Sequence, residues 1–485
     1  MKLEELIENI RYLDAKGNFE KEVSGIEFDS RKVKPGTAFV AQRGLHSDGH
    51  DYIETAEEKG ATVVFCEGFP VKIKSDVTYI TVNDSSQILG ELAAAYYNLP
   101  SGEMKVIGIT GTNGKTSIAT LLHILFMKLG YKTGLISTIS YKINEKSETA
   151  SHTTPNAVKI QQLLNEMVTA GCEFCFMEVS SHAVHQKRIA GIDFSGGVFT
   201  NITHDHLDYH KTFAEYLKAK KGFFDQLPKS AFAIINIDDK NGLVMVQNTK
   251  ALKITYSGRS MADYRVRVLE RHFDGMLLNL AGSEVWTRFV GNFNALNLLA
   301  VYATAVNLGQ DDGEVLTHIS KLKPVEGRFE TVRSADGKLA IVDYAHTPDA
   351  LKNVLGAITE IRTGDEQVIT VIGAGGDRDK TKRPQMAKEA LLASDRVILT
   401  SDNPRTENPA QIIKHMEAGI EPQFRKKVVS IENRREAIKT ASIIARPGDI
   451  ILVAGKGHET YQEVNGVKHH FDDLEELKKC FEIEG

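Results

Sequence analysis

The chain has 485 residues, which is room for about two to four domains of ordinary size. Its 64 acidic and 59 basic side chains leave a net charge of −5, so the overall charge gives no reason to expect a nucleic acid as partner. The N-terminus lacks the basic and apolar regions of a signal peptide, and no segment has the ~18 consecutive apolar residues of a membrane span. We therefore expect a cytoplasmic protein without a membrane partner.

The four cysteines are too few and too scattered for a disulfide framework. Cys172 and Cys175 form one CxxC pattern, but they lie in the apolar run CEFCFMEV. We predict that this pair fills a buried strand and is not a redox or zinc site.

Residues 1–98 alternate short strand patterns with helical ones, which predicts a small α/β domain. No phosphate-binding loop occurs in this part of the chain. The sequence LPSGE at 99–103 then places Pro100 and Gly102 after a helical pattern, and we take it as the first domain boundary.

The segment 105–130 reads as a strand, a glycine-rich turn and a helix. In such a turn, Gly111 and Gly114 let backbone N–H groups point inward, and the positive end of the helix adds to the attraction for phosphate. Lys115 would reach the terminal phosphates of a nucleotide, and Thr116 would ligate Mg²⁺.

The spacing of this loop departs from the standard P-loop pattern, because Ile109 stands where a glycine is expected five residues before Gly114. The alternative reading is a glycine-rich connection that binds nothing. Even as a phosphate site, the loop alone names no reaction.

Apolar runs at 134–137, 172–179, 197–202 and 231–237 alternate with helical patterns, which predicts a parallel sheet with ligands at the carboxyl ends of its strands. Glu178 ends one of these runs and is predicted to ligate Mg²⁺, although a helix-capping or solvated glutamate is the alternative. The segment 203–210, THDHLDYH, is dense in histidine and aspartate. It is predicted to bind a metal or a phosphate, and a solvated loop is the alternative.

A second boundary is predicted near Lys323–Glu330, so the central domain is assigned to 99–326 and a doubly wound α/β domain to 327–485. Three polar turns follow strands of this last domain: AGGDRDKTKRP, SDNPRTENP and AGKGHE. Pro404 would hold Arg405 in a rigid turn. Each turn alone could be a solvated loop, but three at equivalent strand ends predict one shared ligand site.

Taken together, these motifs resemble those of the Mur ligases of bacterial peptidoglycan synthesis, from FDSR at Phe28 to the C-terminal part of the chain. The matching segments are GTNGKT, EVSSH, TNITHDHLDYH, YLKAKK, NFNALN, EGRFE, DYAHTPDAL, GGDRDKTKRP, DNPRTE and AGKGHE. DNPR is the mark of the diaminopimelate-adding members of that family.

The resemblance implies three domains: an N-terminal one for UDP, a central ATPase and a C-terminal one for the amino acid. It implies an ATP-dependent ligase that adds meso-2,6-diaminopimelate to UDP-N-acetylmuramoyl-L-alanyl-D-glutamate through an acyl phosphate. The chain is expected to act as a monomer. The remaining alternatives are a lysine-adding or folylpolyglutamate-type ligase, or, in another class, a P-loop nucleotide switch or scaffold.

By resemblance, the site residues fall into four groups. Those for the UDP substrate are Ser30, Thr153, Thr154, Ser181, Gln186 and Arg188. Those for ATP are Gly111, Thr112, Asn113, Gly114, Lys115, Thr116, Asn294, Asn297, Arg328 and Asp343. Those for the amino acid are Arg378, Asp402, Asn403, Pro404, Arg405, Gly455 and Glu459. The catalytic group is Lys115, Glu178, His206 and Lys220.

The resemblance also implies two Mg²⁺ ions, one held by Thr116 and Glu178 and the other by Glu178 and His206. Lys220 matches the lysine that family members carry as a carbamate, which would help to position a metal. The neighbouring Lys218 and Lys221 leave the register of this match open.

Selectivity for the amino acid is predicted to depend on Arg405. Meso-diaminopimelate differs from lysine by a second carboxylate, and a guanidinium group pairs with a carboxylate through two parallel hydrogen bonds. Lysine would leave Arg405 without that partner. A site of this kind can discriminate by ~10⁴ or more.

Overall fold

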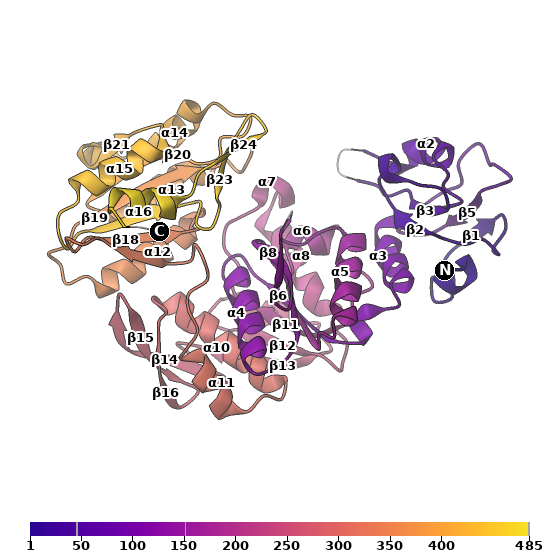
Figure 1. The fold of residues 1–485 in the computed structure, drawn as a ribbon, viewed down its shortest axis with the longest axis horizontal. Coiled ribbons are helices and arrows are strands. Elements are labelled where there is room, and N and C mark those ends of the chain that lie inside the picture. The colour runs from indigo at the N-terminus through magenta and orange to yellow at the C-terminus, as the bar shows by residue number, and fades with distance from the viewer. Residues whose placement is uncertain (45–46, 151, 484–485) are drawn as a thin grey trace.

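The computed structural model describes residues 1–44, 47–150 and 152–483, which form three α/β units (Figure 1). Each unit has its own main sheet, and the three sheets contain five, eleven and six strands in chain order. The predicted three-domain α/β fold class is confirmed. Among the described residues, no helix is long and apolar enough to cross a membrane.

The N-terminal unit has the strand order β1-β5-β4-β3-β2, and only the β1–β5 pair is antiparallel. Alternate residues of β4 serve two faces: Val63 and Phe65 pack in one core, and Val64 and Cys66 in another. The elements are α1 (Leu3–Ile7), β1 (Asp14–Lys16), β2 (Gly25–Glu27), η1 (Ser30–Lys32), β3 (Thr37–Val40), η2 (Gly49–Tyr52), α2 (Ile53–Glu58), β4 (Val63–Cys66), β5 (Thr78–Thr81) and α3 (Ser85–Tyr96).

The central unit contains a sheet in the order β16-β15-β14-β13-β12-β11-β6-β10-β7-β8-β9. Its middle, from β14 to β7, is parallel as predicted. Its strands are β6 (Lys105–Thr110), β7 (Thr133–Ile136), β8 (Ser140–Ile143), β9 (Lys146–Thr149), β10 (Phe174–Glu178), β11 (Phe194–Phe199), β12 (Phe232–Asn236), β13 (Leu252–Ser257), β14 (Tyr264–His272), β15 (Gly275–Leu280) and β16 (Ser283–Thr287).

Both edges of this sheet continue into antiparallel strands that the sequence patterns did not indicate. The short, partly exposed strands β9 and β16 lack the continuous apolar runs by which the buried parallel strands were found. The helices of the unit are η3 (Pro100–Gly102), α4 (Lys115–Lys128), α5 (Ala157–Thr169), α6 (Ser181–His185), α7 (Leu207–His210), α8 (Phe213–Asp225), α9 (Gly242–Met245), α10 (Asn292–Asn307) and α11 (Asp312–Ile319).

The C-terminal unit has the strand order β17-β18-β22-β19-β20-β21, with β17 antiparallel to its neighbour. Helices α12 to α14 cover one face and α15 and α16 the other, so the unit is doubly wound as predicted. Its elements are β17 (Glu330–Arg333), β18 (Leu339–Asp343), α12 (Pro348–Ile361), β19 (Val368–Ala374), α13 (Lys382–Ala393), β20 (Arg396–Ser401), α14 (Pro409–Glu417), η4 (Pro422–Lys427), β21 (Val428–Ser430), α15 (Arg434–Ile444), β22 (Ile450–Ala454), β23 (Tyr461–Val464), β24 (Val467–His470) and α16 (Asp473–Cys480).

The sheet order places the polar motifs together. Strand β6 lies between β10 and β11, so the turn after Thr110 has the ends of two other strands beside it, at Glu178 and Phe199. Of the CxxC pair, Cys175 lies within β10 and Cys172 just before it, and both are buried as predicted.

Candidate active site between the central and C-terminal units

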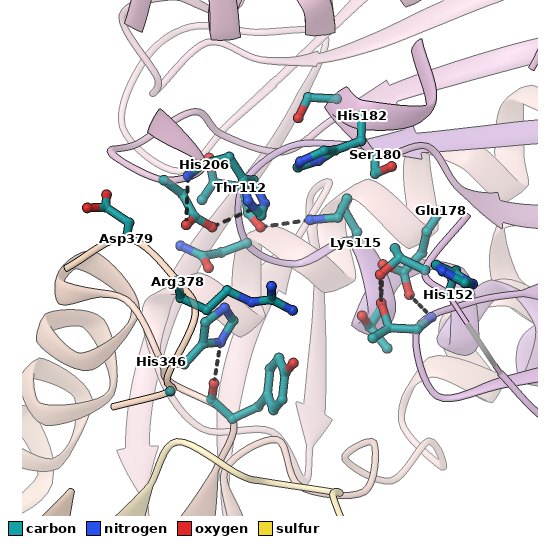
Figure 2. A pocket seen from close by; sticks show the side chains of 18 of the residues that line it. Thr112, Lys115, His152, Glu178, Ser180, His182, His206, His346, Arg378 and Asp379 are labelled. Carbon is teal, nitrogen blue, oxygen red and sulfur yellow. Dashed lines mark hydrogen bonds and ion pairs between the residues drawn. The ribbon is translucent and has the colours of Figure 1, made fainter. Parts of the chain in front are cut away.

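A cavity of about 420 Å³ lies between the central and C-terminal units. Figure 2 shows Lys115, Glu178 and His206 from the central unit facing the same space as Arg378 and His346 from the C-terminal unit. The lining includes these predicted site residues: Thr112, Asn113, Gly114, Lys115, Thr116, Thr153, Thr154, Glu178, Ser181, Arg188, His206, Lys220, Arg328, Arg378, Asp402, Asn403, Arg405, Gly455 and Glu459.

The glycine-rich turn folds as a nest that opens helix α4. Gly111 has a φ of +153°, and a Cβ at this position would lie 1.8 Å from the Thr200 hydroxyl oxygen. The Lys115 ammonium donates hydrogen bonds to the carbonyls of Gly111 and Thr112, at 2.9 and 2.8 Å. Burial lowers the pKa of Lys115. The turn therefore concentrates N–H donors and one ammonium at the end of β6, as a phosphate site requires.

Two predicted nucleotide ligands lie behind this turn and do not line the cavity. Asn294 and Asn297 are buried near the start of α10, and Asn297 donates to the Asn294 side chain at 3.2 Å. The Asn297 amide oxygen lies 2.7 Å from where a Cβ of Gly114 would be. In this arrangement Asn297 packs against the loop at Gly114 and is bonded to Asn294, and the contact of both amides with ATP stays a prediction.

Asp343, at the end of β18, is also buried outside the lining. Its carboxylate accepts hydrogen bonds from the backbone N–H groups of Phe329 and Ala345, at 2.7 and 2.8 Å. Burial raises the pKa of Asp343 to about 6. These bonds fix the segment that carries Arg328, whose guanidinium lies over the Tyr344 ring at 4.4 Å and 3.4 Å from the Thr116 hydroxyl. Asp343 thus holds a cavity residue in place.

Glu178 is fully buried at the end of β10, and its carboxylate accepts from the backbone N–H and hydroxyl of Thr138, at 2.7 and 3.1 Å. Together with the Thr116 hydroxyl it offers the hard oxygen ligands that Mg²⁺ prefers. Within the described residues, however, no three His, Cys, Asp or Glu side chains lie close enough to hold a metal. The donor set therefore fits Mg²⁺ only if substrate oxygens or a carbamate add further ligands.

His206 has a positive φ of 55° and caps the short helix α7. Its Nε2 lies 3.4 Å from the Asp205 carboxylate, which in turn lies 3.9 Å from the Lys382 ammonium of the C-terminal unit. Burial lowers the pKa of His206, so the imidazole is neutral and able to ligate a metal. Another histidine of this segment, His210, contacts the Ser181 hydroxyl at 2.9 Å.

Lys220 is 1% exposed on α8, and its ammonium donates to the Gly111 carbonyl at 2.7 Å. Burial and the neighbouring Lys115 lower its pKa well below the ordinary value. Lys218 is exposed, and Lys221 pairs with Asp225 at 2.6 Å, away from the cavity lining. The tertiary structure thus favours Lys220 over both neighbours as the lysine of the site.

The residues predicted for the UDP substrate are spread over three cavities. Ser30 lines a cavity of about 440 Å³ in the N-terminal unit, and Gln186 lines one of about 260 Å³ between that unit and the central one. The Ser30 cavity and the Gln186 cavity share Phe28 and Gln42 in their linings. The Gln186 cavity also shares His152 and Arg188 with the main cavity. The three cavities therefore lie next to one another along a path that suits an elongated substrate.

Arg188 stands at the junction of that path. Its guanidinium donates to the Gln186 side chain at 2.9 and 2.6 Å and to the Thr154 carbonyl at 2.8 Å. The Thr154 hydroxyl in turn donates to the Glu178 carbonyl at 2.8 Å. This chain of bonds connects the predicted UDP-substrate residues to the predicted metal ligand.

At the opposite wall, Arg405 also has a positive φ, of 52°. Its Nη1 donates to the Gly376 carbonyl at 2.7 Å, and its Nε lies 3.7 Å from the Glu463 carboxylate. Pro404, predicted beside it as an amino-acid ligand, lines a different cavity of about 500 Å³ behind the turn. Its direct contact with the amino acid stays a prediction, whereas its neighbours on both sides line the main cavity.

Several lining residues were not predicted, among them Thr138, Asp205, Tyr344, His346 and Lys382. Four of them lie inside motifs that the sequence analysis singled out, so their presence in the site could have been inferred. Burial lowers the pKa of His346 to about 4. No sequence pattern points to Thr138. Only its hydrogen bonds to Glu178 in the folded structure place it in the site.

Comparison with known proteins identifies the family to which the chain is similar. Three family models match successive parts of the chain: the Mur ligase family catalytic domain at residues 22–97, the Mur ligase middle domain at 109–305 and the Mur ligase glutamate ligase domain at 327–457. Proteins named UDP-N-acetylmuramoyl-L-alanyl-D-glutamate--2,6-diaminopimelate ligase are 56% identical in Phocaeicola vulgatus, over 99% of both chains, and 54% identical in Bacteroides fragilis, over 100% of both. A solved structure of a ligase of that name is 33% identical, covers 99% of both chains and has a TM-score of 0.71.

Proposed function

This chain belongs to the Mur ligase family, and from that premise we propose that it joins meso-2,6-diaminopimelate to UDP-N-acetylmuramoyl-L-alanyl-D-glutamate at the expense of ATP. The observation that carries the proposal is a single cavity lined both by the phosphate-binding turn with Lys115 and by the turn with Arg405. Full-length relatives named as diaminopimelate ligases favour it over a lysine-adding or folylpolyglutamate-type ligase, and over a switch or scaffold.

In the first step, an oxygen of the substrate's terminal carboxylate attacks the γ-phosphorus of ATP, and the bond from that phosphorus to the ADP oxygen breaks. Two anions must meet for this step. Lys115 and the N–H groups of the turn offset their repulsion, and Arg328, beside Thr116, adds a second cation. The product is an acyl phosphate, held at the end of β6.

Mg²⁺ would be held by Thr116, Glu178 and His206, together with a carbamate on Lys220, and two ions are proposed. When bound, Mg²⁺ supplies charge neutralisation for the transferring phosphoryl group. The low pKa of Lys220 supports the carbamate, because the neutral amine is the form that adds to CO₂. The proton that the nitrogen loses in this addition passes to solvent.

In the second step, the amine of diaminopimelate attacks the acyl carbon, and phosphate leaves as the tetrahedral intermediate collapses. The amine proton departs with the phosphate. Arg378 and Arg405 bind carboxylates of the incoming amino acid, and Glu459 binds an ammonium. All three come from the C-terminal unit, so its docking on the central unit delivers the amine to the acyl phosphate.

The path of cavities from Ser30 to Arg188 supports binding of the UDP end in the N-terminal unit. In this proposal the glutamyl carboxylate reaches the main cavity past Thr153, Thr154 and Ser181. We further propose that the chain is a monomer in the cytoplasm, because all three substrates meet within one chain.

The test is phosphate release by the purified protein, measured with ATP, UDP-N-acetylmuramoyl-L-alanyl-D-glutamate and either meso-diaminopimelate or L-lysine. We expect release to require both the UDP substrate and the amino acid, and kcat/KM to be larger for meso-diaminopimelate by ~10⁴ or more. Arg405→Met should remove most of this preference.

Phosphate release without the UDP substrate would indicate a nucleotide switch. Comparable kcat/KM values for the two amino acids would indicate a different ligase. The exposed Arg425→Met is the matched control, and its kinetics should equal those of the unchanged protein.

A further inference from the structure

One fully buried ammonium borders the predicted amino-acid site and has no part in the mechanism above. Lys456 follows β22 in the AGKGHE turn and is 0% exposed. Its Nζ donates to the Asn403 amide oxygen at 3.2 Å and to the Glu459 carboxylate at 3.3 Å. It also lies 5.5 Å from the centre of the Tyr461 ring. A buried charge with this many specific partners calls for a role, because its desolvation is costly.

The bonds to Asn403 fix which way its amide faces. The amide oxygen accepts from Lys456 and, at 2.9 Å, from the backbone N–H of Glu463. The amide nitrogen donates to Glu459 at 2.7 Å. Both acceptor sites of the oxygen are thus filled from the protein, and one N–H hydrogen remains. Asn403 can therefore offer a ligand a donor, which suits a carboxylate.

The same ammonium fixes Glu459. One carboxylate oxygen, Oε2, receives both the Asn403 amide and Lys456, and among the described residues Oε1 has no hydrogen-bond donor. Burial and the neighbouring Asp402 raise the pKa of Glu459. Lys456 acts against this rise because its ammonium lies 3.3 Å from the Glu459 carboxylate, and the Oε1 atom that remains without a donor suits an ammonium.

The hairpin β23–β24 completes the frame around Arg405. The Arg405 N–H donates to the Glu463 carbonyl at 3.0 Å, and the Asn465 N–H donates to the Arg405 carbonyl at 2.7 Å. Nη1 of Arg405 donates a hydrogen bond to the Gly376 carbonyl, whereas Nη2 has no hydrogen-bond acceptor within the described chain. The cavity is therefore lined on one side by Arg405, Asn403 and Glu459. Each of these side chains keeps one hydrogen-bonding group that the described residues do not use.

We propose that Lys456 is the positioning residue for the distal end of the amino-acid substrate: by holding Asn403 and Glu459 it presents the remaining Asn403 N–H, beside the Arg405 guanidinium, to a carboxylate and the Glu459 oxygen to an ammonium. The inference rests on the proposed function and deepens it. A substrate end that bears both charges matches this wall. Lysine, which ends in an ammonium alone, leaves the Arg405 and Asn403 donors unpaired, and buried unpaired donors are costly.

The test is Lys456→Met, which keeps the length of the side chain and removes its charge and donors. We expect KM for meso-diaminopimelate to rise by about 10-fold or more, with kcat within about threefold, because the reacting atoms are not touched. KM for ATP and for the UDP substrate should not change. The preference for diaminopimelate over lysine, as a ratio of kcat/KM values, should fall by about 10-fold.

The matched control is Lys468→Met, since Lys468 lies 4.0 Å from the centre of the same Tyr461 ring but is exposed on β24. Its kinetics should equal those of the unchanged protein. If Lys456→Met does not fold, Lys456→Gln, which retains a donor to Asn403, is measured by the same criteria.

Two results would overturn the inference: a KM for diaminopimelate within twofold of the unchanged protein, or an equal rise in KM for all three substrates, which would indicate a general structural role. The proposed function is judged separately, because its test uses the kinetics of the unchanged protein with diaminopimelate and with lysine and involves no Lys456 variant.

Discussion

A buried lysine, Lys220, and a half-buried one, Lys115, share one acceptor in this site. Lys115 and Lys220 both donate to the Gly111 carbonyl, at 2.9 and 2.7 Å. Two ammonium groups at this separation repel each other in a poorly solvated space, and the pKa of each is lowered by burial. Conversion of Lys220 to an anionic carbamate would replace this repulsion with attraction. The pairing thus gives a physical reason for the proposed modification.

Lys220→Ala is therefore expected to lower kcat by about 100-fold or more, because a metal-positioning group is lost. Added formate, acetate or propionate should restore part of the rate by supplying a carboxylate in the vacated space. The exposed Lys218→Ala is the control and should behave as the unchanged protein does. An unimpaired Lys220→Ala protein would refute the role proposed for Lys220.

At the scale of the element, the strand-turn-helix unit β6–α4 depends on one close approach of backbones. Gly111 packs against Thr200 and Asn201 of the neighbouring strand end, where a Cβ would meet the Thr200 hydroxyl oxygen at 1.8 Å. Gly130, just after α4, also has a positive φ, of +94°, but a Cβ there would meet nothing within 4 Å. A substitution at Gly130 therefore carries only the cost of a positive φ in a residue with a side chain. A substitution at Gly111 carries that cost and a steric clash as well.

We expect Gly111→Ala to raise KM for ATP by at least about 100-fold or to prevent folding, because the turn must shift away from β11. Gly130→Ala should lower the free energy of unfolding by about 1 kcal/mol and leave the kinetics unchanged. Steady-state kinetics and urea unfolding of both variants make the comparison. Equal behaviour of the two would refute the clash at Gly111.

Helix α4 also carries a pH-sensitive buried group, remote from the cavity lining. His123 contacts the Thr133 hydroxyl at 2.7 Å, and burial lowers its pKa to about 4. The imidazole is thus neutral in the folded protein, whereas in the unfolded chain it titrates near pH ~6.5. Its contribution to stability is complete above that pH and is lost as the pH falls from about 6.5 towards 4.

His123→Gln should therefore reduce the acid sensitivity of folding, since glutamine can keep a hydrogen bond to Thr133 without titrating. Between pH 7.5 and 5.5, the free energy of unfolding should fall by about 1 kcal/mol less in this variant than in the unchanged protein. Urea unfolding at the two pH values measures it, with the exposed His469→Gln as control. An identical fall in all three proteins would contradict the prediction.

At the scale of the molecule, the central and C-terminal units lie next to each other (Figure 1), and residues of both units line the main cavity. Near the cavity, the Asn113 amide of the phosphate turn donates to Asp349 at the start of α12, at 3.0 Å. At the other end of α12, Glu360 bonds Arg271 and Asn292 of the central unit at an exposed position. The two contacts join the same units, but only the first involves the phosphate turn.

Asp349→Ala is expected to raise KM for ATP and for the amino acid together, by about 3- to 10-fold, because a partly buried hydrogen bond to a carboxylate is lost. Glu360→Ala should change neither KM by more than about twofold, since exposed ion pairs contribute little. X-ray scattering of both variants with ATP bound would show whether the units separate. A larger kinetic effect of Glu360→Ala would refute this account of docking.

Much of this architecture could be predicted from the sequence, because its signals are local. The segment 105–130 folds as strand β6 at 105–110, a turn and helix α4 at 115–128, as its pattern predicted. The turn between β6 and α4 was predicted to bind phosphate from its glycines and Lys115, and the family was identified from motifs spread along the chain. The antiparallel edges of the central sheet were missed, since short exposed strands bury too little apolar surface to leave a pattern.

What each side chain contacts was decided by the tertiary structure. Asn297 packs against the turn at Gly114, Pro404 lines a separate cavity, and of the lysines at 218, 220 and 221 only Lys220 is buried. The role inferred for Lys456 depends on bonds to residues of two different turns. Local sequence sets which groups exist and which elements carry them. The partners of these groups depend on strand order and on the docking of units, because both bring together residues that are far apart in the chain. The periodicity of a local segment does not encode either of them.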